Sequence, residues 1–258
     1  VIVWADHATG YAGTIEATGG TNGGNGGFVE VSGKSYLDFR GDVDLSGDEL
    51  GTLLLDPDDI DIVAGAANPG EFADDLIAFA ENAGGTSTLG ADTLNTRLSA
   101  NANVTLQANN TIDVDAAITS TGSGNLTLQT GTGGTITVNQ AIDVNTGDLT
   151  FKADEIDINA SLSGTGDIQL TSADATQEIE VGSTNVVALN LTAAELANLQ
   201  NGWNSITIGG SDHDATIAVN ETVSFSDHTS ILNRVDIWTN DSALDINAAI
   251  TTTDNSDL

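Results

Sequence analysis

Short runs in which apolar and polar residues alternate fill the segment from Gly26 to Ile62. Period-two alternation over a few residues predicts β-strands, and the runs are separated by polar turns rich in Gly, Ser, Asp and Pro. Successive short strands with no helix between them predict a solenoid of stacked coils. The apolar positions of this segment are Phe28, Val29, Val31, Leu37, Phe39, Val43, Leu45, Leu53, Leu55, Ile60 and Ile62.

The clearest internal repeat lies between residues 101 and 182. Three apolar series recur, and the first advances by 22, 23 and then 19 residues. The series are Val104, Leu126, Leu149 and Ile168; Ile112, Ile136, Ile156 and Ile179; and Ile118, Ile142 and Leu162. Three strand segments per unit match one coil of a three-faced β-helix. We therefore expect an all-β parallel β-helix of roughly ten coils, ~50 Å long at ~4.8 Å between neighbouring strands.

Two segments break the strand pattern and predict helical excursions, near residues 70–98 and 192–202. The first excursion contains two runs at helical spacing, residues 71–81 and 92–98. The second begins with Thr192 and Glu195, which have the spacing of a capping box, and Gly202 is expected to end it. We interpret both as helices that lie on a face of the shaft; the alternative for the first is a binding knob presented to a partner.

A family resemblance rests on three motifs near the start of the chain. They are V-E-V-S-G-K at Val29–Lys34, L-D-F-R-G-D-V-D-L at Leu37–Leu45 and G-T-L-L-L-D-P-D-D-I-D-I at Gly51–Ile62. These motifs resemble those of the large secreted adhesins of the filamentous haemagglutinin type, which are exported by two-partner secretion. The resemblance is strong over residues 1–62 and looser beyond. It implies a right-handed parallel β-helix outside the cell, an outer-membrane transporter as the export partner, and no catalytic residues.

The charge balance excludes whole classes of partner. The chain has 38 acidic and 5 basic residues and a net charge of −33. Nucleic-acid binding needs a positive surface, so that class is excluded, and adsorption to anionic lipid is disfavoured for the same reason. No apolar run approaches the ~18 residues of a transmembrane helix, so no membrane insertion is expected. There is no Cys, and nothing indicates redox chemistry.

Residues 1–258 are expected to form one solenoid domain. The chain contains no Met and opens on Val-Ile-Val-Trp inside a predicted strand. No signal peptide is visible. We therefore expect the domain to be a fragment or processed segment of a longer secreted repeat protein.

Acidic residues are the candidate metal ligands. Carboxylates on the outward side of stacked strands would lie ~5 Å apart and repel one another unless cations lie between them, with calcium or sodium as the candidates. The alternative is a solvated acidic face, and the G-G-x-G-x-D calcium repeat is absent. The candidates are Asp56, Asp58, Asp59, Asp61, Asp113, Asp115, Asp154 and Asp157.

Three further motifs have structural interpretations that we favour over functional ones. Arg40-Gly41-Asp42 spells the tripeptide that integrins recognise, but its strand–turn–strand context predicts a turn. Every His follows an Asp, and adjacent strand residues point to opposite faces, which disfavours a transition-metal site. The glycine-rich segment 19–27 precedes a strand, whereas a phosphate-binding loop precedes a helix.

The sequence supports three functional hypotheses. The first is a non-catalytic adhesin shaft that binds host or neighbouring-cell glycans or proteins. The alternative is a structural subunit of an extracellular filament, sheath or biofilm matrix, self-associating head to tail through strand edges. The third, less favoured, is a polysaccharide-active enzyme with paired carboxylates. We predict no catalytic residue and, calcium aside, no cofactor.

Overall fold

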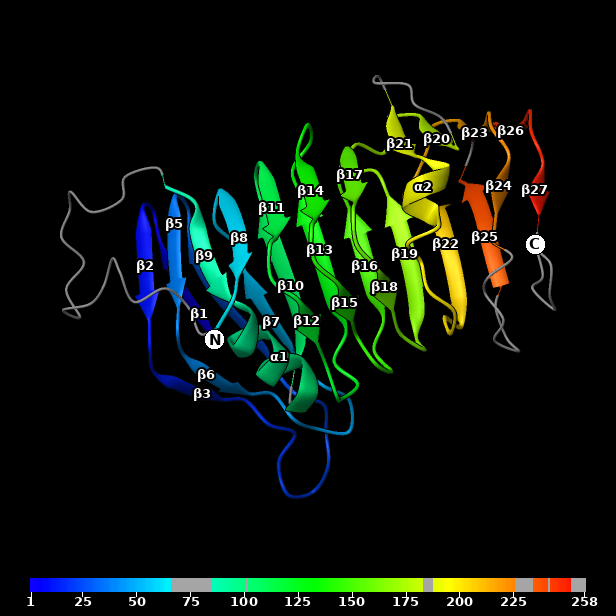
Figure 1. Cartoon of the computed structure of the whole chain (residues 1–258). Helices are drawn as coiled ribbons and strands as arrows, with labels where there is room; N and C mark the ends of the chain where they lie inside the picture. Colours follow the sequence, from blue (N-terminus) through cyan, green and yellow to red (C-terminus); the bar gives the residue numbers. More distant parts are fainter. Residues whose placement is uncertain (66–84, 101, 183–187, 226–233, 241, 252–258) are drawn as a thin grey trace.

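The computed structural model describes residues 1–65, 85–100, 102–182, 188–225, 234–240 and 242–251. A parallel sheet of nine strands extends along the whole molecule (Figure 1). Its neighbours are three strands apart in the chain, so each coil contributes one strand to this face. In spatial order the strands are β1 (Ile2–Ala5), β4 (Phe28–Gly33), β7 (Thr52–Leu55), β10 (Asn103–Ala108), β13 (Leu126–Thr130), β16 (Leu149–Lys152), β19 (Asp167–Thr171), β22 (Ser205–Gly210) and β25 (Arg234–Thr239).

Shorter parallel sheets build the second face of the solenoid. A two-stranded sheet lies in the N-terminal coils, a five-stranded sheet in the middle and a four-stranded sheet in the C-terminal coils. They contain β2 (Ala8–Tyr11) and β5 (Tyr36–Phe39); β9 (Ser87–Gly90), β8 (Asp59–Val63), β11 (Thr111–Val114), β14 (Thr135–Val138) and β17 (Glu155–Ile158); and β21 (Leu189–Leu191), β20 (Ile179–Val181), β23 (Ile217–Val219) and β26 (Leu244–Ile246).

Very short strands make the third face, in sheets of two or three. They are β3 (Thr14–Glu16) with β6 (Asp42–Asp44); β12 (Ile118–Thr119), β15 (Ile142–Asp143) and β18 (Leu162–Ser163); and β24 (Val223–Ser224) with β27 (Ile250–Thr251). The described residues thus form a parallel β-solenoid, as the sequence predicts. The nine-stranded sheet indicates nine coils among the described residues, close to the roughly ten expected. Two coils are longer than the others, as the pairing of Thr52 with Asn103 and of Ile168 with Ile206 shows.

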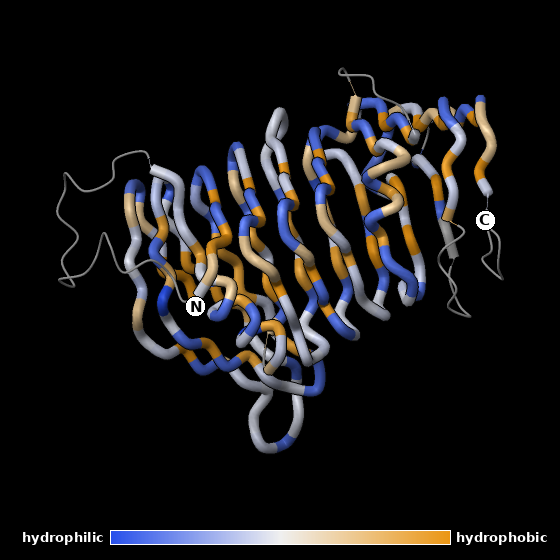
Figure 2. The backbone as a smooth tube through the Cα atoms, viewed as in Figure 1, coloured by the Kyte–Doolittle hydropathy of each residue, from blue (hydrophilic) through white to orange (hydrophobic). Residues whose placement is uncertain are grey.

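The predicted apolar series form columns in the core. Val104, Leu126, Leu149 and Ile168 are successive partners in register, which confirms the offsets read from the sequence. Each is at most 1% exposed. Figure 2 shows hydrophobic segments that recur from coil to coil. Because each inward side chain meets its equivalent in the next coil, one repeated choice of Val, Ile or Leu fills the whole core.

One member of the second series is placed differently from the prediction. Ile112, Ile136 and Ile156 stack as expected. Ile179 was expected to follow Ile156, but it pairs with Leu189 and Ile217 in a separate sheet. The extra strand β21, which contacts β17, belongs to this coil and separates the two sheets. The prediction failed because the period-two pattern does not reveal which of two strands in a long coil joins which sheet.

The helix α1 (Ala91–Ala100) takes the place of a third-face strand. Arg97 forms an ion pair with Asp42 of β6 at 2.6 Å, and Asn95 Oδ1 accepts the backbone N–H of Thr119 in β12 at 2.8 Å. Leu94 and Leu98 are buried. The helix predicted at 92–98 is confirmed, but it lies within the stack, between β6 and β12, and not on its surface. The run predicted at 71–81 lies outside the described residues.

The helix α2 (Ala193–Leu196) is shorter than predicted. The capping box is confirmed, because Thr192 Oγ1 accepts Glu195 N–H at 3.2 Å and Glu195 Oε2 accepts Thr192 N–H at 2.7 Å. The extension to residue 202 was wrong. Leu199 already forms a parallel bridge to Leu162 of β18, so the chain must leave the helix to complete the third face.

A ladder of Asn and Asp side chains joins the starts of the strands in the nine-stranded sheet. Asn103 Oδ1 accepts the N–H of Asn125 at 2.9 Å, Asn125 Oδ1 accepts that of Asp148, and Asp148 Oδ1 accepts that of Asp167, both at 2.8 Å. Each side chain satisfies a backbone donor of the following coil. Part of the acidic composition therefore has a structural role.

Candidate functional site

Acidic side chains form a column on the outward side of the second face. Strand register makes Asp61, Asp113, Thr137 and Asp157 successive partners across β8, β11, β14 and β17. The intervening residues on these strands are buried, so the column points outward. Asp61 and Asp113 lie on directly paired strands, but Thr137 separates Asp113 from Asp157. The column thus holds one adjacent carboxylate pair and is not a continuous ladder.

Three other candidate carboxylates are held by side chains of the next coil. In each case an amide or hydroxyl supplies the donor, so the carboxylate has a partner within the protein. The bonds run from Asn109 Nδ2 to Asp58 Oδ1, from Thr111 Oγ1 to Asp59 Oδ1 at 3.0 Å, and from Asn139 Nδ2 to Asp115 Oδ1 at 2.8 Å. These bonds connect consecutive coils on the outward side of the shaft.

Asp154 lies apart from the column and acts as a structural clamp. It is 9% exposed and accepts three hydrogen bonds. The donors are Gly133 N–H at 2.6 Å, Ser172 Oγ at 2.8 Å and Asp174 N–H at 2.7 Å. Its oxygens are therefore occupied by the protein, which leaves little capacity for a metal ion.

Burial and like charge raise the pKa of three acidic groups. For Asp61 the largest cause is burial, followed by the charges of Asp115 and Asp113. Burial raises the pKa of Asp56, with Glu30 and Asp58 adding to it, and the pKa of Glu155, with Asp157 and Glu195 adding to it. Asp61 Oδ1 is also buried without a hydrogen-bond partner among the described residues.

Asp61→Asn is expected to stabilise the protein at pH 7. The raised pKa of Asp61 means that the folded state favours the protonated form. Its stabilising contribution is therefore complete below the unfolded pKa and is lost as the pH rises through the folded pKa. The neutral amide avoids that loss of stability and also removes the repulsion between Asp61 and the paired Asp113, which is worth ~0.2–1 kcal/mol. Thermal unfolding should show an increase in Tm of about 2–4 °C per kcal/mol gained.

The pH dependence gives the control for this prediction. The wild type should gain Tm as the pH falls from 7 through the raised pKa values, and Asp61→Asn should gain less. Asp174→Asn should lower the Tm at pH 7, because hydrogen bonds from the backbone and hydroxyl of Thr176 lower the pKa of Asp174 and so stabilise its ionised form in the folded state. A lower Tm for Asp61→Asn at pH 7 would show that this carboxylate is stabilised as an anion.

The described residues contain no group of three or more His, Cys, Asp or Glu side chains that could hold a metal ion. His213 is 0% exposed, whereas the adjacent Asp212 is exposed, so this Asp–His pair does not converge. His228 lies outside the described residues. Calcium binding by the acidic column stays a prediction. The column would present one adjacent pair of carboxylates, Asp61 and Asp113, to such an ion.

The tripeptide Arg40-Gly41-Asp42 is engaged within the solenoid. Arg40 forms an ion pair with the buried Asp38 at 2.9 Å. Arg97 of α1 pairs with Asp42 and donates to the carbonyl of Gly41 at 2.8 Å. These contacts confirm the turn interpretation. The segment 19–27 likewise packs against residues 46–49 of the next coil, where Gly24 N–H bonds Asp48 Oδ2 at 2.8 Å, and a strand follows it.

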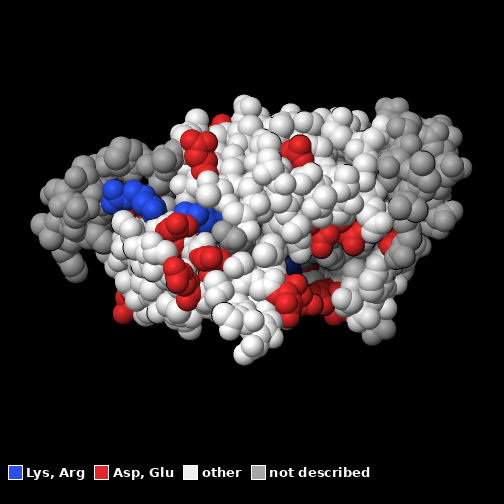
Figure 3. Space-filling model, turned by 90° about the horizontal axis from the view of Figure 1, so that it is seen from below, with Lys and Arg blue, Asp and Glu red and all other residues white. Residues whose placement is uncertain are grey.

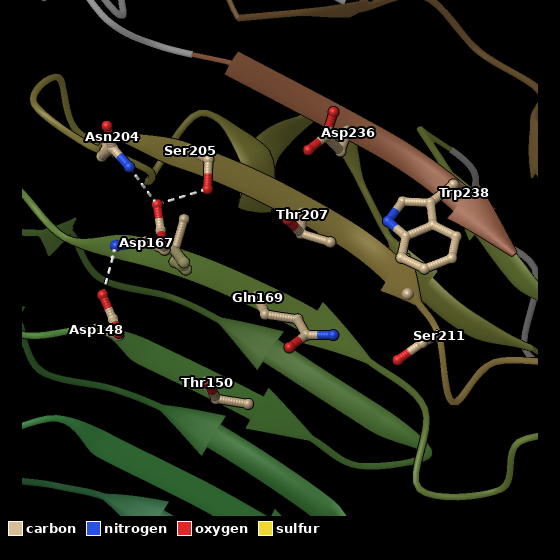
Figure 4. Close-up of a pocket in the computed structure, with 12 residues that line it drawn as sticks. Asp148, Thr150, Asp167, Gln169, Asn204, Ser205, Thr207, Ser211, Asp236 and Trp238 are labelled. Atoms are coloured by element: carbon tan, nitrogen blue, oxygen red, sulfur yellow. Dashed lines mark hydrogen bonds between the residues drawn. The ribbon is translucent and has the colours of Figure 1, made fainter.

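An open groove of about 630 Å³ lies on the outward side of β16, β19, β22 and β25. Figure 4 shows Trp238 and Ser211 at one end and Asp148, Asp167 and Asn204 at the other, with polar side chains between them. Its main lining side chains are Asp148, Thr150, Asp167, Gln169, Asn204, Ser205, Thr207, Ser211, Asp236 and Trp238. Asp167 Oδ1 accepts Asn204 Nδ2 and Ser205 Oγ, both at 2.7 Å. Strand register thus gathers residues from four coils on one surface.

The sequence prediction missed this groove. Trp238 follows the partly buried, inward Ile237, so alternation alone assigns it to the outward side. The adjacent glycines, Gly209 and Gly210, are also visible in the sequence. The pairing of Gly209 with Trp238, however, follows from the register between β22 and β25, which the irregular spacing of these coils hides.

No family model, curated protein or solved structure matches this chain. Among the described residues, no helix has the length and apolar character needed to span a membrane. The functional argument therefore rests on the residues and their arrangement.

Proposed function

We propose that this chain is a non-catalytic shaft segment of a secreted or cell-surface adhesin. The observation that carries the proposal is the uninterrupted nine-stranded parallel sheet, which makes a rod from repeated short coils. A rod of this kind suits the display of binding surfaces away from a cell. The resemblance of residues 1–62 to filamentous haemagglutinin-type adhesins supports the same function.

The surface chemistry agrees with an extracellular shaft. The net charge of −33 opposes non-specific association with acidic surfaces and keeps the rod soluble. Figure 3 shows acidic side chains spread over one face, with basic ones mainly toward the N-terminal coils. Each coil contacts mainly its neighbours, so the chain can fold coil by coil as it emerges from a transporter. Export through an outer-membrane transporter is part of this proposal.

A bead assay tests the adhesive function. Beads coated with the folded chain should be retained on host or neighbouring cells, and beads coated with Leu128→Asp, whose solenoid we expect to be disrupted, should not. Protease added to intact producing cells should digest the protein. Absence of retention on every cell type tried, together with protection from protease, would refute the proposal. Release of sugars from a polysaccharide panel would refute its non-catalytic part.

A second candidate, a subunit of an extracellular filament, sheath or biofilm matrix, is favoured by apolar residues at the C-terminal end of the stack. Leu244 and Ile246 are exposed on β26, although their partners in register, Ile217 and Val219, are buried. A further coil, from the same polypeptide or a second copy, would cover them and pair with the strand edge. Sedimentation and negative-stain imaging with calcium and with chelator separate the two candidates. Short single rods favour the adhesin shaft; long fibres favour the filament, and fibres that dissolve in chelator would identify the acidic column as a cation site.

A further inference from the structure

The groove on β16, β19, β22 and β25 combines one exposed aromatic ring with a polar floor. Trp238 is 43% exposed, whereas Trp203, in the adjacent coil, is 0% exposed. Among the described side chains, the lining contains three carboxylates and no Lys or Arg. A volume of about 630 Å³ lies within the usual range for small-ligand sites.

Glycines in β22 keep the indole ring accessible. Register pairs Gly209 with Trp238, so no side chain of β22 covers the ring at that position. Gly209 has φ of 84°, in the left-handed region that favours glycine. A Cβ at Gly209 would lie 2.4 Å from the carbonyl oxygen of Trp238, and one at Gly210 would lie 2.7 Å from Gln169 Nε2. Larger residues are therefore disfavoured at both positions, at Gly209 by the contact with the backbone and at Gly210 by its φ of 129°.

The polar side chains of the floor are fixed by the protein but keep unused acceptors. Gln169 Nε2 donates to the carbonyl of Gly209 at 2.9 Å, which leaves Oε1 as an acceptor. Asp148 and Asp167 both accept through Oδ1, and among the described residues each keeps Oδ2 for another donor. Thr150, Gln169 and Thr207 are successive partners in register, so they form an outward row across three strands. Pre-positioned groups of this kind lower the entropic cost of binding.

The chemistry of these groups selects a class of ligand. An aromatic ring is apolar over its face, which matches the face of a sugar ring that carries C–H groups. Carboxylate, amide and hydroxyl side chains match the many hydroxyls of a sugar, which both donate and accept. An anionic ligand would meet three carboxylates, and no basic side chain lies among the described lining residues to offset their charge. A purely apolar ligand would leave the polar floor without partners.

The backbone disfavours a peptide as the ligand. Extended peptides commonly bind by adding a strand to an exposed sheet edge. At this groove the backbone groups of β19 and β22 are used in pairing with strands on both sides. Over β19 and β22 a ligand must therefore bind through the side chains above the sheet, as a sugar can, whereas a peptide strand could pair only at β25, which ends the sheet.

We infer that this groove binds a short neutral oligosaccharide, with Trp238 stacked against a sugar ring and Gln169, Asp167 and Thr207 bonding its hydroxyls. This assignment rests on the proposed adhesive function for its biological meaning and names the ligand class and residues of one binding surface on the shaft. The row of polar side chains crosses the strands, so the oligosaccharide lies along the solenoid axis.

The test is an array of immobilised neutral, acidic and basic oligosaccharides, followed by calorimetry with the soluble sugar that binds. Trp238→Ala should weaken binding by about tenfold or more, and Trp238→Phe should lose less because it keeps an aromatic face. Gln169→Ala should weaken binding by a similar factor through one hydrogen bond. Trp4→Ala is the matched control, because Trp4 is 55% exposed on β1 at the opposite end of the sheet.

The outcomes separate this inference from the proposed function. Folded wild-type protein that binds no neutral glycan, or that binds a basic peptide in their place, overturns the inference. An equal loss in Trp4→Ala and Trp238→Ala overturns it as well. If Trp238→Ala keeps wild-type glycan binding and beads carrying it still adhere to cells, the shaft adheres through another surface and only the groove assignment fails. If glycans bind the groove but wild-type beads adhere to no cell, the adhesive function fails and the groove assignment stands.

Discussion

Leu128→Asp is expected to abolish the folding of the central coils. Leu128 is 0% exposed and lies between Leu106 and Phe151 in the inward column of the nine-stranded sheet. A carboxylate placed there has no cation or hydrogen-bond donor to replace water, so the protein must bury a charge or open the coil. We expect a loss of more than about 4 kcal/mol. Circular dichroism should show reduced strand content and a broad, early thermal transition.

Gln129→Asp is the matched control for that substitution. It adds the same charge one residue away, on the outward side of β13. Register places position 129 beside Lys152, so the new carboxylate gains an opposite charge. We expect a change in unfolding free energy within about 0.5 kcal/mol. Similar instability in both variants would show that added charge, and not burial, disrupts the solenoid.

Trp203→Ala is expected to have the second-largest effect. Trp203 is the largest fully buried side chain among the described residues. Its ring lies over Gly164, where a Cβ would come within 2.6 Å of the indole. Removing it leaves a cavity between the coil that contains α2 and the coil beneath, at a cost of about 3–5 kcal/mol. Thermal unfolding should show a decrease in Tm of about 10 °C or more.

Two other substitutions define the cause of that loss. Trp203→Phe should lose less than half as much, because Trp203 Nε1 has no hydrogen-bond partner among the described residues and phenylalanine removes that buried donor. Trp238→Ala should leave Tm nearly unchanged, since its ring is 43% exposed. A large loss in Trp238→Ala would mean that this ring stabilises the fold, and its role as a binding surface would then need a different variant.

The two largest effects have one origin in the architecture. In a stack of coils, each inward residue contacts mainly the equivalent residues above and below, and contacts across long sequence distances come from this stacking. A defect in a central coil therefore removes the interface on both of its sides. A defect in an outward position, such as Gln129 or Trp238, removes neither.

The sequence by itself determined the coil, its three faces and the register of the regular coils. The regular coils place the same types of residue at equivalent core positions. The sequence alone therefore allowed the alignment of Val104, Leu126, Leu149 and Ile168. The capping box at Thr192 and the helix at 92–98 could be predicted because their signals are local. The turn interpretation of Arg40-Gly41-Asp42 also followed from local context.

Only the tertiary structure decided how the irregular coils fit the stack. The sequence pattern cannot show that α1 replaces a third-face strand, that Leu199 completes a coil or that β21 separates β17 from β20. Each of these placements depends on which segment of the adjacent coil lies beside the element in the folded protein. The same holds for the surfaces. Asp61 meets Asp113 and Trp238 meets Gly209 through pairing between residues far apart in the chain, and insertions of varying length hide that pairing from the sequence.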